Sequence, residues 1–257
     1  MKNGDYFKGR RVLVTGASSG IGAAVARLLA RYGAVPILVG RDLDRLTMVA
    51  EACGPQTHFI AGDLTDPIFI QGLGERLNDF GVDIAILNAG IAAYDSDGDF
   101  SPHTCHRIFQ TNVGAVVDCI GLVLPILKRT HGQLVLMSSI AGYGGLPHAA
   151  SYCASKAAVR ALGQSLDLDL RPLGVPVTVI CPGFVKTPLT DLNQFSMPFI
   201  ISDDNAATEI AVGIAERRHE VHFPRRLSLL LKLVTSLPAG FQYQLLRWAT
   251  RPKRQGC

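Results

Sequence analysis

The chain has 257 residues, of which 48% are hydrophobic and 18% are charged, so it is long and apolar enough to bury a large core. This composition excludes a disordered, collagen-like or strongly acidic chain. The formal net charge of +4 is too small to indicate nucleic-acid binding, but it is unevenly distributed, because residues 217–257 carry nine Lys/Arg and one acid. We therefore expect a slightly acidic globular body with a basic C-terminal end.

The cysteines and the N-terminus indicate the compartment. The six cysteines show no Cys-x-x-Cys spacing and lie mostly in apolar stretches, which is typical of free thiols in a reducing environment. Residues 1–11 are polar and do not resemble a secretory signal. No stretch approaches the roughly 18 apolar residues needed to span a bilayer. A cytoplasmic protein is expected.

Short runs rich in Val, Ile and Leu alternate with helix-length segments through the first 180 residues. The predicted strands are Arg11–Thr15, Val35–Val39, Thr57–Ala61, Asp83–Leu87, Leu134–Ser138 and Val175–Ile180. The predicted helices are Gly20–Tyr32, Asp42–Ala52, Asp66–Asp79, Pro102–Lys128 and Ser151–Leu170. The strands lack alternating polarity, so both of their faces are expected to be covered. Repeated strand–helix–strand units predict an α/β Rossmann fold with a doubly wound parallel sheet.

The pattern loosens after Pro182. Leu189–Ser202 is a candidate substrate loop, Asp204–Arg218 a predicted helix and Glu220–Phe223 a candidate last strand. Without a linker or repeat, residues 1–224 are expected to form one dinucleotide-binding and catalytic domain. Residues 225–257 are expected to add a basic, amphipathic helical extension.

A glycine-rich turn joins the first strand to the first helix. Glycines let the backbone bend sharply and approach a pyrophosphate, and a helix N-terminus offers free N–H groups and a positive dipole. The strand–turn–helix context favours dinucleotide binding over a purely structural turn, although the spacing is Gly-x-x-x-Gly-x-Gly and not Gly-x-Gly-x-x-Gly. The residues expected to bind nucleotide here are Gly16, Ser18, Ser19, Gly20, Ile21 and Gly22.

Three further motifs follow along the chain. Asn88-Ala89-Gly90 comes after the fourth strand, Tyr152 and Lys156 lie four residues apart in a predicted helix, and Pro182-Gly183 follows the sixth strand. Together with the glycine turn, these motifs resemble the short-chain dehydrogenase/reductase family over roughly residues 8–224. The resemblance implies a nicotinamide-dependent oxidoreductase that acts on ketones or secondary alcohols.

Arg41, directly after the second strand, bears on the choice of cofactor. An acid at this position would bind the ribose hydroxyls of NAD and repel a 2′-phosphate, whereas the planar fork of arginine suits phosphate. The resemblance implies the same, so NADP(H) is favoured over NAD(H). Asp42 either pairs with Arg41 or caps the next helix. By resemblance, Asp63 contacts the adenine. The residues expected to line the adenosine pocket, or to support the sheet beside it, are Asp63, Leu64, Asn88, Ala89 and Gly90.

Tyr152 and Lys156 share one helix face, so they form either an acid–base pair or a plain surface pair. A free tyrosine has a pKa of about 10, too high for easy proton exchange at neutral pH. A nearby ammonium and a positively charged nicotinamide would both favour tyrosinate, so we expect a lowered pKa and a role as general acid.

The resemblance implies two more catalytic residues. Ser139, thirteen residues before Tyr152, would hydrogen-bond the substrate oxygen, with its neighbour Ser138 as the alternative. Asn112 would open its helix locally and hold a water that links to Lys156. If Ser139, Tyr152 and Lys156 were not present as well, Asn112 would be interpreted as a capping or core asparagine.

The loop after the sixth strand is implied to hold the nicotinamide. Proline fixes one backbone angle there and glycine permits close approach. The residues concerned are Pro182, Gly183, Val185 and Thr187. No metal is expected, because His103, Cys105 and His106 lack a second pair of ligands.

The C-terminal extension repeats apolar residues at helical spacing among Lys and Arg. The apolar positions are Leu227, Leu230, Leu231, Val234 and Leu237. A disordered end stays open, as do two ordered alternatives: peripheral contact with an anionic membrane interface at its inner face, or a cover over the substrate loop or a partner subunit. Both fit an apolar, lipid-like carbonyl or alcohol substrate.

The resemblance also implies a homodimer or homotetramer formed through helices Pro102–Lys128 and Ser151–Leu170. A dinucleotide-sensing protein without turnover is the alternative function, since folds of this kind do not dictate activity. The complete set of acid–base residues disfavours it.

Overall fold

The computed structural model describes residues 3–94, 99–188, 190, 197 and 199–249. Within these residues the predicted doubly wound fold is confirmed, because seven parallel strands form one sheet in the order β3-β2-β1-β4-β5-β6-β7. The strands are β1 (Arg11–Thr15), β2 (Val35–Gly40), β3 (His58–Ala61), β4 (Ile84–Leu87), β5 (Gln133–Met137), β6 (Val177–Pro182) and β7 (Glu220–Phe223). The strand order reverses between β1 and β4, and ligands of open α/β sheets bind at such a switch point.

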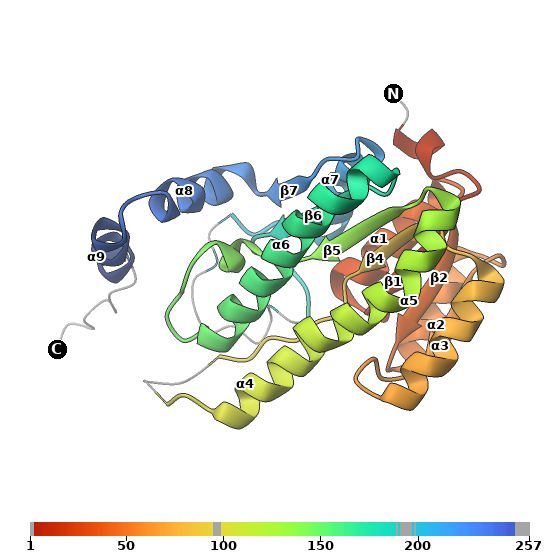
Figure 1. Cartoon of the computed structure of the whole chain (residues 1–257), viewed down its shortest axis with the longest axis horizontal. Coiled ribbons are helices and arrows are strands. Elements are labelled where there is room, and N and C mark those ends of the chain that lie inside the picture. The colour runs from red at the N-terminus through yellow and green to blue at the C-terminus, as the bar shows by residue number, and fades with distance from the viewer. Residues whose placement is uncertain (1–2, 95–98, 189, 191–196, 198, 250–257) are drawn as a thin grey trace.

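Helices cover both faces of the sheet (Figure 1). On one face lie α1 (Gly20–Arg31), α2 (Leu43–Cys53) and α7 (Asp203–Ala215). On the other lie α3 (Pro67–Phe80), α5 (Ala115–Thr130) and α6 (Ala150–Leu170). Each layer has its own buried apolar core, and the Val-, Ile- and Leu-rich strands contribute side chains to both. This explains why the strands show no alternation of polarity.

The helix predicted at Pro102–Lys128 is divided into α4 (Pro102–Phe109), a π-helical turn (Gln110–Gly114) and α5. The helical run Pro102–Thr130 is 29 residues long and contains an 18-residue window with a mean hydropathy of 1.5, so by length and composition alone it could span a membrane. The expectation that no stretch comes near that length is therefore wrong. In the fold, however, buried side chains of α5 such as Val123 and Leu127 belong to the core beside the sheet.

The sixth strand is displaced from its prediction. It was expected at Val175–Ile180, but β6 runs to Pro182 because it pairs with β7 up to Phe223. This extension carries Pro182 to the edge of the sheet where the site residues gather.

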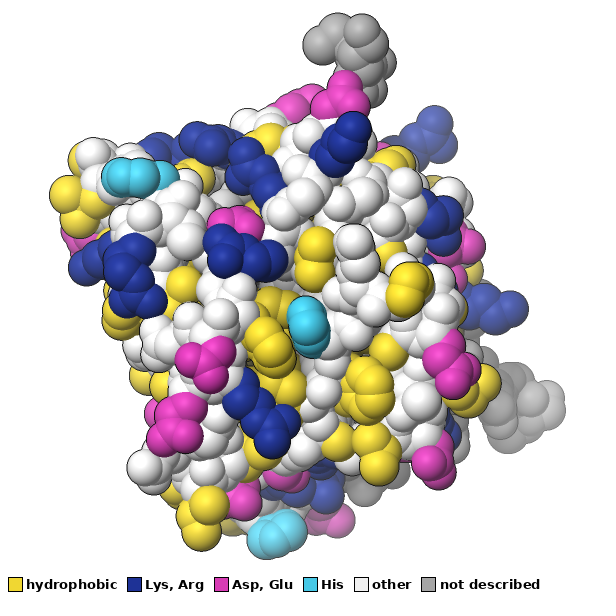
Figure 2. Space-filling view, turned by 90° about the vertical axis from the view of Figure 1, so that its right-hand side faces the viewer, with side chains coloured by type: hydrophobic (Ala, Val, Ile, Leu, Met, Phe, Trp, Pro, Cys, Tyr) yellow, Lys and Arg dark blue, Asp and Glu magenta, His cyan; other side chains and the backbone are white. Residues whose placement is uncertain are grey.

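The chain ends in α8 (Arg225–Thr235) and α9 (Ala239–Ala249), which extend beyond β7 at the left of Figure 1. The opposite end of the molecule, which carries α2 and α3, has apolar side chains interspersed with groups of both charges (Figure 2).

Candidate active site

The glycine turn has a backbone that other residues would strain. Gly16 and Gly20 have φ values of +64° and +53°, in the left-handed region. A Cβ on Gly22 would lie 2.4 Å from the carbonyl oxygen of Gly16. Ser19 is the N-cap of α1, but its side chain makes no capping hydrogen bond. The first N–H groups of α1 therefore lack a side-chain acceptor from the cap, as an anion-binding helix N-terminus requires.

Asn88 and Thr15 join β4 to this turn. The Asn88 Nδ2 donates to the carbonyl oxygens of Thr15 at 2.9 Å and Gly16 at 3.3 Å. The Thr15 hydroxyl accepts from the backbone N–H groups of Asn88 at 2.9 Å and Ala89 at 3.1 Å. Asn88 thus supports the sheet and the turn, as expected, with its amide directed to the backbone.

Around the turn, the remaining predicted residues differ in what they offer a ligand. Ser18 lies against Gly40 at the end of β2, where an added Cβ would be 3.2 Å from the Ser18 hydroxyl. Ile21 is half-buried against the core. Leu64 is buried among core side chains, so its backbone groups are what it can present to a nucleotide.

Arg41 and Asp63 lie side by side at the ends of β2 and β3. The Arg41 Nη1 is 3.7 Å from Asp63 Oδ2, with side chains 67% and 45% exposed. Such an exposed pair is weak, so the guanidinium can exchange its partner for a phosphate. Burial alone would raise the pKa of Asp63, but hydrogen bonds from Thr65 and the Arg41 charge outweigh it and lower that pKa. Asp42 does not pair with Arg41: its Oδ1 caps α2 by accepting from the N–H of Arg45.

Ser139 and Tyr152 are brought together from the end of β5 and the start of α6. The Ser139 hydroxyl acts to lower the pKa of the Tyr152 phenol, so the two hydroxyl groups lie close together. The Ser139 hydroxyl also accepts from the N–H of Ala141 at 3.1 Å and donates to the carbonyl of Pro182 at 3.3 Å. Ser138 points elsewhere, to the backbone carbonyl of Lys156 at 2.7 Å. Of the two serines, only Ser139 lies at the phenol.

Lys156 is buried beneath this pair. Its Nζ donates to the carbonyl of Met137 at 2.9 Å and lies 5.9 Å from the centre of the Tyr152 ring. Burial lowers the pKa of Lys156 to about 8. Burial also raises the pKa of Tyr152, against a smaller lowering effect of the Ser139 hydrogen bond. The expected lowering of the tyrosine pKa is therefore wrong for the protein's own groups, because desolvation of the phenol exceeds what they supply.

Asn112 lies in the π-helical turn, so the expected local opening of the helix is present. Its side chain is fully buried; Oδ1 accepts from the N–H of Ile91 at 2.8 Å, while Nδ2 donates to the Ile91 carbonyl at 2.9 Å and to the Ser155 hydroxyl at 3.1 Å. Asn112 thereby fastens the segment after β4 to α6. A Cβ on Gly90 would lie 3.2 Å from both Asn112 Oδ1 and Lys156 Nζ, so glycine fits between them. The water link to Lys156 stays a prediction.

The segment after β6 returns toward the glycine turn. Gly183 donates its N–H to the carbonyl of Phe223 at 2.6 Å, and Val185 forms a parallel bridge with Ile201. The Thr187 methyl group lies 3.2 Å from where a Cβ on Gly20 would be. Thr187, which was expected to help hold the nicotinamide, thus lies beside the start of α1, where the pyrophosphate was expected to bind.

The candidate substrate loop Leu189–Ser202 falls mostly outside the described residues. The structure describes residues 190, 197 and 199–202 of it. Phe199 and Ile200 are 54% and 43% exposed. Among the described residues, no three His, Cys, Asp or Glu side chains are grouped as metal ligands.

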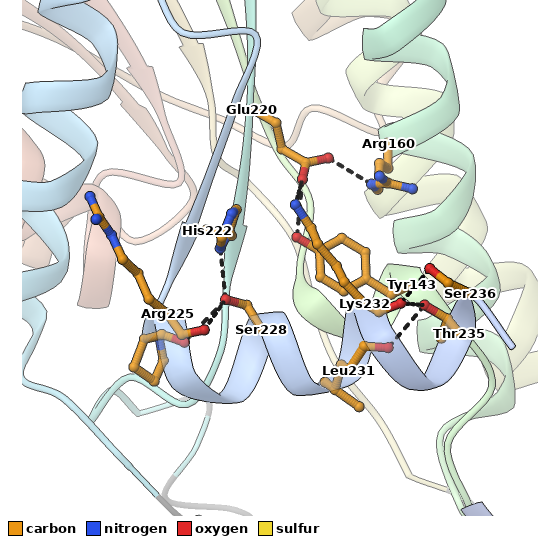
Figure 3. Close-up of polar contacts among 11 residues, drawn as sticks. Tyr143, Arg160, Glu220, His222, Arg225, Ser228, Leu231, Lys232, Thr235 and Ser236 are labelled. Carbon is orange, nitrogen blue, oxygen red and sulfur yellow. Dashed lines mark hydrogen bonds and ion pairs between the residues drawn. The ribbon is translucent and has the colours of Figure 1, made fainter. Parts of the chain in front are cut away.

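The sequence analysis did not single out Glu220, a buried carboxylate at the start of β7 (Figure 3). The Glu220 side chain is 7% exposed and pairs with Arg160 of α6 at 2.8 Å and Lys232 of α8 at 2.6 Å. The Tyr143 hydroxyl donates to it at 3.2 Å. Glu220 is the one acid among residues 217–257, and that isolation is a signal from which its pairing could have been predicted.

These features fit a dinucleotide. The positive-φ glycines, the α1 N-terminus and an exchangeable arginine occupy the carboxyl edge of β1 and β2, where phosphates and ribose bind in such sheets. The acid–base candidates lie at the carboxyl end of β5, along the same edge of the sheet. The candidate site therefore has one half whose residues suit a nucleotide and one half whose residues suit proton transfer.

Known proteins resemble the chain over most of its length. The model of the short chain dehydrogenase family matches residues 10–195. The chain is 36% identical over 238 residues to an uncharacterized oxidoreductase of Myxococcus xanthus, covering 89% of this chain and 93% of that protein. It is 30% identical over 274 residues to dehydrogenase/reductase SDR family member 7B of Bos taurus, covering 97% and 84%. It is 33% identical over 218 residues to oxidoreductase UcpA of Salmonella typhimurium, covering 82% of each. The chain belongs to the short-chain dehydrogenase/reductase family and is an oxidoreductase of that type.

Proposed function

We propose that the protein is an NADP(H)-dependent reductase of apolar ketones, able to run in reverse on the secondary alcohols. The observation that carries the proposal is the grouping of the Ser139 and Tyr152 hydroxyls beside the buried Lys156. A dinucleotide sensor would need the glycine turn and Arg41 but would leave this pair without a role. The reductase is therefore favoured.

The glycine turn and Arg41 are proposed to hold the nucleotide. The N–H groups at the start of α1 would bind the pyrophosphate, and Arg41 would leave Asp63 for the 2′-phosphate. Val185 and Thr187 would hold the nicotinamide end. When bound, the nicotinamide supplies the hydride for reduction and accepts it in oxidation.

Tyr152 is proposed to give its phenolic proton to the carbonyl oxygen of the substrate. Because burial raises its pKa, the phenol is protonated at neutral pH, which is the form that reduction requires. Ser139 would donate a hydrogen bond to the same oxygen and hold it near the phenol. Lys156, with a pKa of about 8, is mostly charged at pH 7 and would stabilise the tyrosinate that remains.

The surroundings of the phenol support an apolar substrate. Tyr152 packs against a small cluster of buried or partly buried side chains. Its members are Ala141, Leu146, Ala149 and Cys153. These groups offer few partners to a polar substrate.

Tyr152→Phe tests the activity. Turnover of NADPH with a panel of ketones of graded chain length should fall by about 10²–10⁴-fold, because the general acid is removed. The NADPH dissociation constant, measured by fluorescence, should stay within a few-fold of the wild-type value. Turnover within threefold of wild type, for the ketone the wild-type enzyme reduces fastest, would refute the assignment.

Arg41→Ala tests the cofactor preference, and Arg45→Ala is its matched control. The two arginine side chains are 67% and 63% exposed and each pairs with an aspartate. Arg41→Ala should weaken NADPH binding at least tenfold more than NADH binding, because NADH has no 2′-phosphate. Arg45→Ala should change both similarly. Equal losses for the two nucleotides in Arg41→Ala would contradict the preference for NADP(H).

A further inference from the structure

Helix α8 is held firmly by the side that faces the body. Leu227 and Leu231 pack against a buried cluster that includes Ile140 and Val179. The fully buried Ser228 hydroxyl lies 2.7 Å from Nδ1 of His222 on β7. With an apolar contact and a buried polar contact on one side, α8 has a fixed rotation about its axis.

The Glu220 network strengthens this attachment (Figure 3). Lys232, one turn after Ser228, reaches inward to Glu220, which also binds Arg160 of α6. A lysine that would otherwise extend into solvent is thus neutralised at the base of α8. The network fixes which residues of α8 remain outside.

The outside of both helices carries many large apolar side chains. The exposed apolar residues are Leu229, Leu230, Leu233, Phe241, Tyr243 and Leu245. Each is between 42% and 68% exposed. Together with the exposed Arg225, Arg226 and Arg247, they form what we call the α8–α9 surface. An amphipathic helix that only covered the body would present polar groups here. An exposed apolar surface of this kind marks an interaction site.

The charge on these helices has one sign. Residues 225–249 contain four Lys/Arg and no Asp or Glu. Lys232 is neutralised by Glu220, whereas Arg225, Arg226 and Arg247 are exposed beside the apolar residues. Three further basic residues follow at Arg251, Lys253 and Arg254 in the sequence.

We propose that the α8–α9 surface docks on an anionic membrane surface. Leucine and aromatic side chains would enter the interface while the arginines contact anionic lipid headgroups. A second copy of the chain in a twofold arrangement would instead place this basic surface against itself, where like charges repel. Anionic lipid complements both the apolar and the basic part. The proposal does not depend on the proposed reaction.

Vesicle flotation with the full chain tests the proposal. The probes are vesicles of phosphatidylcholine alone and of phosphatidylcholine with phosphatidylglycerol. The wild-type protein should float with the anionic vesicles, and less so as salt is raised, because surface charges are screened. The triple variant Leu229→Ser/Leu230→Ser/Leu233→Ser and the double variant Arg225→Gln/Arg226→Gln should each bind at least tenfold more weakly.

The double variant Met48→Ser/Ile68→Ser is the matched control. These residues are 68% and 82% exposed and lie on α2 and α3 at the opposite end of the molecule. The control should float like wild type, and all variants should keep the wild-type circular dichroism spectrum. Wild-type protein that does not float, or that binds neutral vesicles equally well, would overturn the proposal. So would a triple variant that binds vesicles like wild type but loses a dimer in light scattering.

Discussion

Ser138 and Ser139 are neighbours that serve different parts of the structure: the Ser138 hydroxyl donates to the backbone of Lys156 at 2.7 Å, whereas the Ser139 hydroxyl acts on the Tyr152 phenol and lowers its pKa. Alternation of side chains at the end of an extended strand separates them. One serine fastens α6 to β5, and the other is presented at the site.

Replacing each serine by alanine should therefore have different effects. Ser139→Ala should lower kcat for ketone reduction by about 10²-fold, because a hydrogen bond to the developing oxygen charge is lost. Ser138→Ala should lower the free energy of unfolding by about 1–2 kcal/mol and leave kcat within a few-fold. Steady-state kinetics and urea denaturation distinguish the two. The assignment fails if Ser138→Ala is the variant that loses turnover.

The pH dependence should follow Lys156. With a pKa of about 8, its ammonium loses charge as pH rises through that value, and the tyrosinate left by proton donation becomes less stable. We expect kcat/KM for reduction to decline above about pH 8. In Lys156→Arg, which keeps its charge, any remaining activity should decline at higher pH. A wild-type profile that is flat from pH 7 to above 9 would count against this role of Lys156.

Gly22 and Gly72 make a matched pair for stability. A Cβ on Gly22 would lie 2.4 Å from a backbone oxygen, so Gly22→Ala should cost about 1–3 kcal/mol through overpacking. A Cβ on Gly72, in α3, would meet nothing within 4 Å, so Gly72→Ala should add about 0.5–1 kcal/mol through helix propensity. Urea denaturation measures both. Equal changes in the two variants would show that the turn tolerates a side chain.

Glu220→Gln should destabilise the fold in a pH-dependent way. Burial opposes ionisation of Glu220, but Lys232 and Arg160 outweigh it and hold its pKa below the usual range. A depressed folded-state pKa gives stability that is full above the unfolded value of about 4.3 and is lost as pH falls through the folded value. The expected loss at neutral pH is about 1–3 kcal/mol, since two cations lose their partner.

The control is Glu216→Gln, whose carboxylate pairs with Arg218 but is 48% exposed. It should change the free energy of unfolding by less than about 0.5 kcal/mol. Thermal unfolding from pH 4 to 8 compares the two variants. A Glu220→Gln deficit that does not shrink toward acid pH would mean that its charge is not what stabilises the fold.

The fold could be predicted from the sequence because local patterns carried it. Uninterrupted apolar runs marked strands buried on both faces, and the glycines marked the turn whose backbone requires them. The sequence favoured Ser139 as the site residue but left Ser138 as the alternative, because a shift of one residue along a strand turns the side chain to the opposite face. β6 was misplaced by two residues because its end depends on β7, a contact between segments forty residues apart.

The rest depended on distant contacts. The apolar positions in residues 225–257 predicted a single apolar helix face, but in α8 Leu227 and Leu231 face the body while Leu230 is exposed. The raised pKa of Tyr152 reflects burial that no local pattern reveals. Cytoplasmic location, homodimer or homotetramer formation and the division at residue 224 stay predictions.

The wide turn around Asn112 has a consequence for how this chain can vary in length. A π turn holds one more residue than an α turn, so Gln110–Gly114 resembles a regular helix with a single insertion. Deleting one residue there would restore ordinary pitch but rotate everything before it by about 100° relative to α5. Ile108, buried on α4, would then leave the interior. We therefore expect a one-residue deletion in Gln110–Gly114 to disrupt the packing of α4, even where the remaining residues would favour a helix.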